Sequence, residues 1–331
     1  MPKPLATAPS HYVDAQALKP LFRRRPMKHA GAILFNWATI VGTAYLCTQY
    51  FNPLAYLLAV LIIGARMHAL AILMHDATHF RFLQNRKWND LVTNITTMYP
   101  MFSTIERYRQ NHLRHHKNLN TEQDPDWAAK LDNPAYRFPK SQWEFFGTLI
   151  SYFALYPGIR DAISILKRFA PTEKPAASAR GGAQARLAFY MALIGVLTLF
   201  NLWKAYALFW LVPYVSTLFM FQYIRSVAEH FGALKYDHEL NSSRTVKPTA
   251  IERFFLAPHH VGYHLEHHLY PGVPFYNLPA LHNLLMQNPS YEARAHITNG
   301  YWKGLTQELG PTSAQFPFRG HEVAQAHPSS R

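Results

Sequence analysis

Long apolar segments alternate with polar segments along this chain, and the longest apolar ones hold almost no charged residues. Four of them predict membrane-spanning helices, at about residues 31–50, 53–74, 187–200 and 205–223. An α-helix rises about 1.5 Å per residue, so about 20 residues cross the roughly 30 Å hydrocarbon layer of a bilayer. The third segment is short for a span. The pattern predicts an all-α integral membrane protein with four transmembrane helices in two hairpins.

Between the two hairpins, residues 143–169 are partly apolar but are interrupted by a Pro-Gly pair, so each piece is too short to span. We expect helices that lie in the membrane interface here. Residues 171–185, rich in Ala, Gly and Pro, predict a flexible linker. We therefore divide the chain into a cytoplasmic N-terminal segment (1–30), a membrane domain (31–290) and a C-terminal tail (291–331).

Composition agrees with a membrane protein. Charged residues make up 16% of the 331 residues, against roughly a quarter in an average soluble domain. No Asp or Glu lies between Asp14 and Asp76 or between Glu173 and Glu229, and the four predicted spans fall in these two windows. The single cysteine, Cys47, excludes an intramolecular disulfide framework. A simple soluble globule and a disulfide-stabilised scaffold are therefore both excluded.

The basic residues indicate an orientation. A net charge of +14 is typical of nucleic-acid binding, but six Lys or Arg precede Gly31 and none lies between the first two spans. Cytoplasmic segments of membrane proteins carry such an excess of Lys and Arg. The charge thus reports topology, with both termini in the cytoplasm and no nucleic-acid partner. Arg66, inside the second span, is expected to snorkel toward the interface.

Histidines gather where the apolar hairpins end. His75 and His79 form an H-x-x-x-H box at the end of the second span, and His230 follows the fourth span. Two H-x-x-H-H boxes lie in the polar segments, at residues 112–116 and 264–268. Helical residues three and four apart share a face, so each box is expected to aim two or three nitrogens at one point. Because both hairpins return to the same side, the boxes meet in one cytoplasmic helical cap.

So many imidazoles predict a metal centre. Imidazole suits zinc, copper, nickel and iron, and eight or nine ligands exceed what one ion holds. Two metal ions fit the count, in a site that is nearly all nitrogen. A pair of irons held in this way can bind and reduce dioxygen. Its position beside the bilayer points to a lipidic substrate.

These motifs resemble those of the membrane fatty acid desaturase superfamily, over roughly residues 30–290. The boxes read H-D-A-T-H, H-L-R-H-H and H-L-E-H-H, and A-E-H-F-G around His230 is similar to the extra histidine of the family. The chain looks like a bacterial-type acyl desaturase. The resemblance implies a non-haem centre of two irons (Fe), with O2 as co-substrate. By motif match the iron ligands are His75, His79, His112, His115, His116, His230, His264, His267 and His268.

Residues beside these ligands are candidates to position them, since metal-bound imidazoles usually donate their other N–H to a neighbouring acceptor. In the family's acyl-CoA branch an Asn stands where this chain has a serine, which could hold a water. The candidates are Asp76, Ser226, Glu229, His260 and Glu266. The segment Asp124-Pro125-Asp126 resembles a stretch that often follows the second box.

We therefore expect an O2-dependent acyl-chain desaturase of the bacterial inner membrane, acting on an acyl lipid, acyl-CoA or acyl-ACP. The sequence lacks the His-Pro-Gly-Gly haem motif of cytochrome b5, so a separate ferredoxin- or cytochrome b5-like donor with its reductase would supply electrons. One alternative is a hydroxylase or ketolase of a lipid or carotenoid that uses the same centre. Another is a non-enzymatic membrane protein that binds haem or metal.

Overall fold

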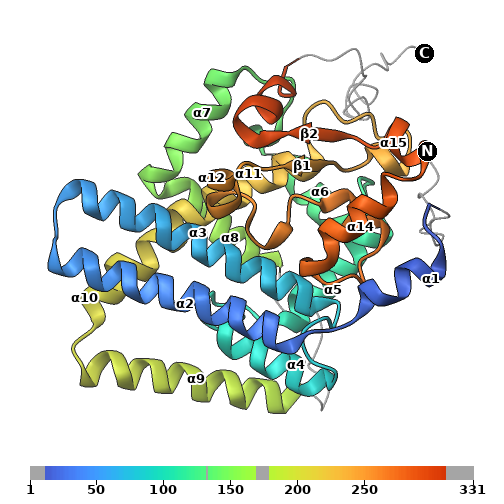
Figure 1. Cartoon of the computed structure of the whole chain (residues 1–331). Helices are drawn as coiled ribbons and strands as arrows, with labels where there is room; N and C mark the ends of the chain where they lie inside the picture. The colour runs from blue at the N-terminus through green and yellow to red at the C-terminus, as the bar shows by residue number, and fades with distance from the viewer. Residues whose placement is uncertain (1–11, 132, 169–178, 311–331) are drawn as a thin grey trace, which may run out of the picture.

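The computed structural model describes residues 12–131, 133–168 and 179–310, and the fold in these ranges is mostly helical. Long helices lie beside one another in the lower part of Figure 1, and most of the short helices gather around the N-terminal end of α2 and the C-terminal end of α3. Helix α3 is central, because it is buried almost without interruption from Ala59 to Thr78. The long helices thus form a base, and the short ones build a cap at one end of it.

Within the described residues, four helices are long and apolar enough to cross a membrane, as predicted. Their mean hydropathies over the most apolar stretch lie between 1.4 and 2.2. Two are α2 (Pro26–Gln49) and α3 (Pro53–Thr78), which are joined by a short turn in which the side chain of Asn52 accepts a hydrogen bond from Ala55 N at 2.9 Å. Proline at the first position of α3 suits a helix start, because its missing N–H would be unpaired there in any case.

The other two candidate spans are longer than predicted. Helix α9 is Ala179–Leu199, so residues 179–185 of the predicted linker are helical. Alanine, arginine and glutamine in this stretch have high helix propensity, and the span needs the added length. Residues 171–178 of that linker lie outside the described residues. The fourth helix is continuous from Trp203 to His230, seven residues beyond the predicted end.

That fourth helix is irregular in the middle. It starts as α10 (Trp203–Tyr206), passes through π-helical turns at Ala207–Leu211 and Tyr214–Leu218, and ends as α11 (Phe219–His230). Pro213 separates the two π turns, where its missing N–H interrupts the hydrogen-bond ladder. Because α11 ends at His230, the helix delivers this histidine directly into the cap.

The prediction that Arg66 snorkels to the interface is wrong. Its side chain is buried, its Nη1 donates to Asn36 Oδ1 at 3.3 Å, and its Nη2 donates to the carbonyl of Phe254. The guanidinium also lies over the Phe254 ring, 3.9 Å from the centroid. A buried cation needs such partners, since leaving it unpaired in an apolar environment is costly. Arg66 therefore ties α2 and α3 to the cap.

Two short helices occupy the segment predicted to lie in the interface. Helix α7 is Gln142–Ser151 and α8 is Tyr156–Arg168, with a 3-10 turn at Tyr152–Ala154 between them. Neither is a candidate span, and Phe169 lies outside the described residues. Their large exposed apolar side chains are Trp143, Ile150, Phe153, Tyr156, Ile159 and Ile163.

The remaining elements form the cap. The helices are α1 (Ala15–Leu18), α4 (Arg86–Thr93), α5 (Ile105–Lys117), α6 (Pro125–Leu131), α12 (Ala250–Phe255), α13 (His264–Leu269), α14 (Leu278–Leu285) and α15 (Pro289–Arg294). Strand β1 (Thr245–Lys247) pairs in parallel with β2 (Ile297–Asn299), with Val246 opposite Thr298. This two-stranded sheet joins the segment before the last histidine box to the chain that follows it.

Residues 291–310, assigned above to a C-terminal tail, are part of the folded cap. Tyr301 and Leu309 are buried, and the carbonyl of Leu309 accepts a hydrogen bond from Lys140 N at 2.7 Å. Glu308 forms an ion pair at 3.1 Å with Arg244, which is fully buried. Periodicity within the tail does not reveal these contacts, because they come from distant segments.

Candidate metal centre

Four separate segments deliver the nine predicted ligands to one end of the helical base. His75 lies in the last turn of α3 and His79 caps that helix. Helix α5 carries His112, His115 and His116, and α13 carries His264, His267 and His268. His230 is the last residue of α11. The structure therefore brings all nine predicted histidines together, in two groups.

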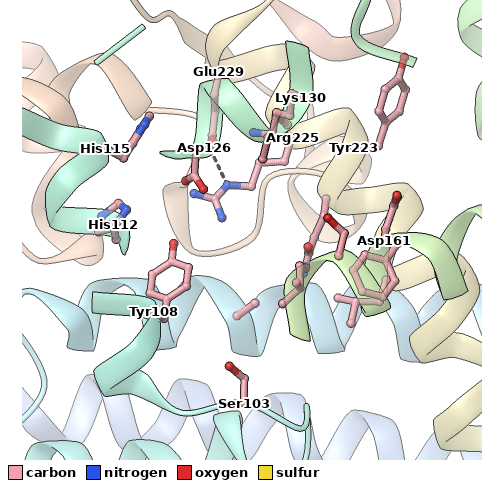
Figure 2. Close-up of a pocket in the computed structure, with 18 of the residues that line it drawn as sticks. Ser103, Tyr108, His112, His115, Asp126, Lys130, Asp161, Tyr223, Arg225 and Glu229 are labelled. Carbon is pink, nitrogen blue, oxygen red and sulfur yellow. Dashed lines mark hydrogen bonds and ion pairs between the residues drawn. The ribbon is translucent and has the colours of Figure 1, made fainter. Parts of the chain in front are cut away.

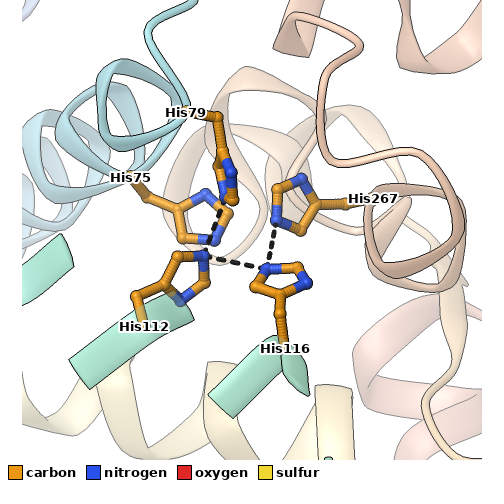
Figure 3. A group of neighbouring side chains, drawn as sticks. All are labelled: His75, His79, His112, His116 and His267. Atoms are coloured by element: carbon orange, nitrogen blue, oxygen red, sulfur yellow. Dashed lines mark hydrogen bonds between the residues drawn. The ribbon is translucent and has the colours of Figure 1, made fainter. Parts of the chain in front are cut away.

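The first group contains five histidines and is shown in Figure 3; we call it the five-histidine group. Its members are His75, His79, His112, His116 and His267. Nε2 of His112 lies 2.9 Å from Nε2 of His79 and 2.9 Å from Nε2 of His116. Nε2 of His116 in turn lies 3.2 Å from Nε2 of His267. Rings from three segments thus point their nitrogens at one small volume.

The second group, the four-histidine group, contains His115, His230, His264 and His268. Nε2 of His264 lies 2.9 Å from Nε2 of His230 and 3.0 Å from Nε2 of His268. The ring of His115 lies 4.9 Å from that of His230 and 5.1 Å from that of His268, measured between centroids. In both groups the ligand nitrogens lie within 4.8 Å of one another.

Each H-x-x-H-H box aims two of its three histidines at one group, within the two or three nitrogens expected. The two residues four apart stay together, as His112 and His116 do in one group and His264 and His268 do in the other. The residue three after the first, His115 or His267, joins the opposite group. One residue advances a helix by about 100°, so adjacent histidines leave the helix in different directions. Each box therefore contributes to both groups.

The donor chemistry fits metal ions. Imidazole nitrogens bind zinc at about 2.0–2.1 Å, so two nitrogens bound at a right angle lie about 2.9 Å apart. The observed separations of 2.9–3.2 Å agree with this. Burial, together with neighbouring histidines, holds the pKa of His112, His264 and His267 well below its usual range. These rings are therefore neutral, the form in which imidazole binds metal.

Two carboxylates lie behind the four-histidine group. Asp124 Oδ2 is 2.9 Å from His115 Nδ1, and Glu229 Oε1 is 3.3 Å from His264 Nδ1. Glu229 also accepts a hydrogen bond from Arg225 Nε at 2.6 Å. A carboxylate in this position orients the ring and makes it a stronger ligand. Glu229 is thus placed as predicted, whereas Asp124 was recognised only as part of a resembling stretch, and its spacing of nine residues from His115 gave no sign of the contact.

The other candidates do not contact a ligand ring. Asp76 accepts a hydrogen bond from Phe275 N at 3.0 Å and lies 3.4 Å from His29 Nδ1. Glu266 accepts from His282 Nδ1 at 2.5 Å and from the Tyr291 hydroxyl at 2.9 Å. Both acids adjoin ligands in the sequence, but neighbouring positions on a helix face different ways. The two predictions are therefore wrong, and both acids instead hold the cap together.

The last two candidates also stand apart from the ligands. The ring of His260 lies 6.3 Å from that of Tyr263, between centroids, and its backbone has a φ of 58°. Ser226 is buried, and its Oγ has no hydrogen-bond partner among the residues that the structure describes. Ser226 is among the residues that line a cavity beside the histidines.

A cavity of about 250 Å³ adjoins the histidines, and Figure 2 shows it with part of its lining. His115, His230 and His264 of the four-histidine group line one end, together with His112. The rest of the wall is mixed. Apolar residues include Met74, Met98, Met101, Leu218 and Phe219, and polar ones include Ser103, Tyr108, Asp126, Lys130, Arg225 and Glu229. Sequence patterns could not reveal this cavity, because its wall combines residues of six α-helices with π-helical turns and loops.

Comparison with known proteins agrees with this geometry. Residues 51–299 match the family model described as fatty acid desaturase. Over 303 residues the chain is 31% identical to a dihydrorhizobitoxine desaturase of Bradyrhizobium elkanii, covering 87% of this chain and 83% of that protein. It is 26% identical to a chloroplastic omega-6 fatty acid desaturase of Glycine max, over 72% of this chain but only 57% of the relative. An sn-1 acyl-lipid omega-3 desaturase (ferredoxin) of Nostoc is 23% identical, with 74% and 71% covered.

Proposed function

Because the chain belongs to the fatty acid desaturase family, we propose that it is an O2-dependent membrane desaturase that introduces a C=C bond into an acyl chain. Its relatives are named desaturases, so the protein is an oxidoreductase. The alternative of a non-enzymatic haem- or metal-binding protein is thereby excluded. The substrate, the metal and the electron donor are parts of the proposal.

The two groups of converging imidazoles are the observation that carries it. We assign one iron to the five-histidine group and one to the four-histidine group. When bound, a pair of irons supplies the oxidising power to remove two hydrogens from adjacent methylene carbons, with O2 as the oxidant. Each group gathers rings from three different segments, and this rigid placement lets one chain hold two ions close together.

The protein's own residues bind and shield the substrate. The cavity begins at the four-histidine group, so a chain bound in it lies against His115, His230 and His264. Met74, Met98 and Phe219 give its wall an apolar part that excludes water from the methylene groups. Holding an unreactive carbon next to the oxidant is itself a large part of catalysis. The wall thus selects which carbons are exposed to oxidation.

Topology and partners complete the proposal. With four spans in two hairpins, the cap, both histidine groups and both termini lie on the cytoplasmic side of a bacterial inner membrane, where soluble electron carriers can reach them. The membrane domain then covers residues 31–290, with the folded residues up to 310 added to it. The Nostoc relative is named for ferredoxin, which supports a separate ferredoxin- or cytochrome b5-like donor with a reductase.

Product analysis tests the proposal. The purified protein, supplied with a reductant, a donor protein and ¹⁸O2, should convert an acyl substrate to a product two hydrogens lighter that contains no ¹⁸O. Incorporation of ¹⁸O into the product would instead support the hydroxylase or ketolase alternative. Expression in a host that lacks the activity, followed by lipid profiling, identifies the chain length and the carbons attacked.

A further inference from the structure

A second hollow, of about 520 Å³, lies away from the histidines, between residues 133–140 and helices α7 and α8. Its charged lining consists of three cations and one acid. These are Arg137, Lys140, Arg160 and Glu144. Polar groups of Asn133, Thr148, Ser151 and Tyr152 complete the wall. Such a surplus of donors favours an anionic ligand.

Lys140 is the key residue, because its side chain is buried and its charge is only partly offset. Only 8% of its surface is exposed. Its Nζ donates to the carbonyl of Ala135 at 2.8 Å and to the Tyr223 hydroxyl at 3.4 Å, which uses two of its three N–H groups. Within the described ranges, no carboxylate forms an ion pair with Lys140. Burial lowers the pKa of this ammonium, and a bound anion would offset that effect.

Glu144, the acid in the wall, offsets part of the Lys140 charge but forms no ion pair with it within the described ranges. The carboxylate of Glu144 accepts hydrogen bonds at 2.7 Å from both the backbone N and the hydroxyl of Ser141, which caps α7. At the rim, Arg160 forms an exposed ion pair with Asp161 at 3.1 Å, and Arg137 is exposed. Arginine can grip an anion with two parallel hydrogen bonds, while lysine contributes a point charge. This combination suits a phosphate group.

The hollow is linked to the cavity at the metal centre. Asn133 and Tyr223 line that cavity, Asn133 also lines the hollow, and the Tyr223 hydroxyl touches Lys140. Tyr223 and His230 are seven residues apart in α11, which is about 10 Å along the helix. Figure 2 shows Tyr223 on the side of the cavity opposite His115. The hollow and the cavity therefore adjoin each other, with Asn133 and Tyr223 between them.

The exposed aromatic residues near the hollow indicate that it lies at the membrane surface. It lies against α7 and α8, whose side chains Trp143 and Tyr156 are 86% and 71% exposed. Large aromatic side chains of this kind favour the boundary between lipid and water. Phosphate is the charged group found at that boundary, in lipid head groups.

We propose that Arg137, Lys140 and Arg160 bind a phosphate group of the substrate, which anchors the substrate while its chain enters the cavity at the metal centre. This inference rests on the proposed function in one respect, that the anchored molecule is the one oxidised. The phosphate can belong to a phospholipid head group or to the carrier arm of an acyl thioester. Both sources present the same chemistry to the site.

Binding experiments with the full chain in detergent test the site without relying on activity. The probes are inorganic phosphate, coenzyme A and phosphatidylglycerol in mixed micelles. We expect at least one to bind, with a Kd raised about tenfold or more in Lys140→Gln and in Arg137→Gln, a change of about 1.4 kcal/mol. Arg137 is exposed, so Arg137→Gln should fold normally. This variant therefore tests the site even if Lys140→Gln unfolds. Lys204→Gln, which removes an exposed cation at the opposite end of the fourth span, is the control and should bind as wild type does.

Preference for phosphatidylglycerol would identify a lipid head group, and preference for coenzyme A a carrier arm. Equal binding by wild type and both variants, or no binding of any probe, would overturn the site. Activity measurements distinguish failure of the phosphate site from failure of the proposed function. If wild type forms no desaturated product, the proposed function fails whatever the binding shows. If product forms, Lys140→Gln should raise KM with little change in kcat. Lys140→Arg, which keeps the charge, should have a KM close to that of the wild type.

Discussion

The five-histidine and four-histidine groups use the same helices but have different surroundings. In the four-histidine group, Asp124 and Glu229 lie behind two of the rings, and three of its histidines line the cavity. In the five-histidine group, none of the rings forms an ion pair with a carboxylate of the described chain, and only His112 reaches the cavity. His79 and His116 of that group are partly exposed.

If each group holds one iron, as proposed, this difference makes the two metal sites unequal. Five neutral imidazoles nearly fill the positions around one ion, so the five-histidine group is suited to hold a metal rather than to open a position for a reactant. Four imidazoles leave more room, and acids behind them raise the donor strength of the rings. The four-histidine group also faces the cavity. We infer that it governs the reaction with substrate, and the following predictions test that division.

Removing a ligand should have the largest effect. His115→Ala leaves three rings in the four-histidine group, whereas His116→Ala leaves four in the other. Substituting a residue that hydrogen-bonds to a metal ligand typically lowers activity roughly 10–100-fold, and both of these ligand variants should lose more activity than that. Of the two, His115→Ala should lose more iron. Metal analysis of the purified variants measures this. His260→Asn is the control, since asparagine tolerates its φ of 58° and His260 belongs to neither group.

Neutralising Asp124, the carboxylate beside the His115 ring, should have the second largest effect on metal binding. Asp124→Asn can still accept the hydrogen bonds that Asp124 Oδ1 receives from Asp126 N and Trp127 N, so the start of α6 is kept. The amide has no charge to offer His115, and we expect about a 10–100-fold loss of metal affinity at the four-histidine group. Competition with a chelator provides the measurement. Loss of both metals in parallel would contradict two separable sites.

Glu229→Gln should have a smaller effect on the same group. The contact from Glu229 to His264 is longer, at 3.3 Å, and the carboxylate is shared with Arg225. We expect a loss nearer the lower end of the range, about tenfold. The same chelator competition measures it, expressed per folded protein, because the buried Arg225 loses its charged partner. A loss larger than that of Asp124→Asn would reverse the order we assign to the two acids.

Tyr291→Phe should leave the metal centre unchanged. It removes one hydrogen bond to Glu266, which is fully buried in the cap and touches no ligand ring. We expect a stability loss of about 1–3 kcal/mol and an unchanged iron content. Thermal unfolding and metal analysis of one preparation give both values. Loss of iron from folded protein would mean that Glu266 supports the ligands after all.

The sequence predicted which histidines lie together, because histidine is rare at the ends of apolar helices and here recurs at helical spacings. It did not predict how the ligands divide, because the division depends on how α5 and α13 are rotated against each other. Asp76 and Glu266 were misassigned for the same reason, since adjacency in a helix turns a side chain away from its neighbour. Arg66 depends on contacts with distant segments, which spacing along the chain does not encode. Asp124 reaches His115 across the turn between α5 and α6, so helical spacing does not reveal that contact.

Mössbauer spectroscopy of the purified chain loaded with ⁵⁷Fe tests the central claim most directly, because it counts iron and distinguishes iron environments. Two unequal histidine groups predict two irons per chain, seen as two quadrupole doublets of equal area. Asp124→Asn should alter one doublet and leave the other unchanged. A single iron per chain, or a single doublet that Asp124→Asn shifts as a whole, would contradict the account.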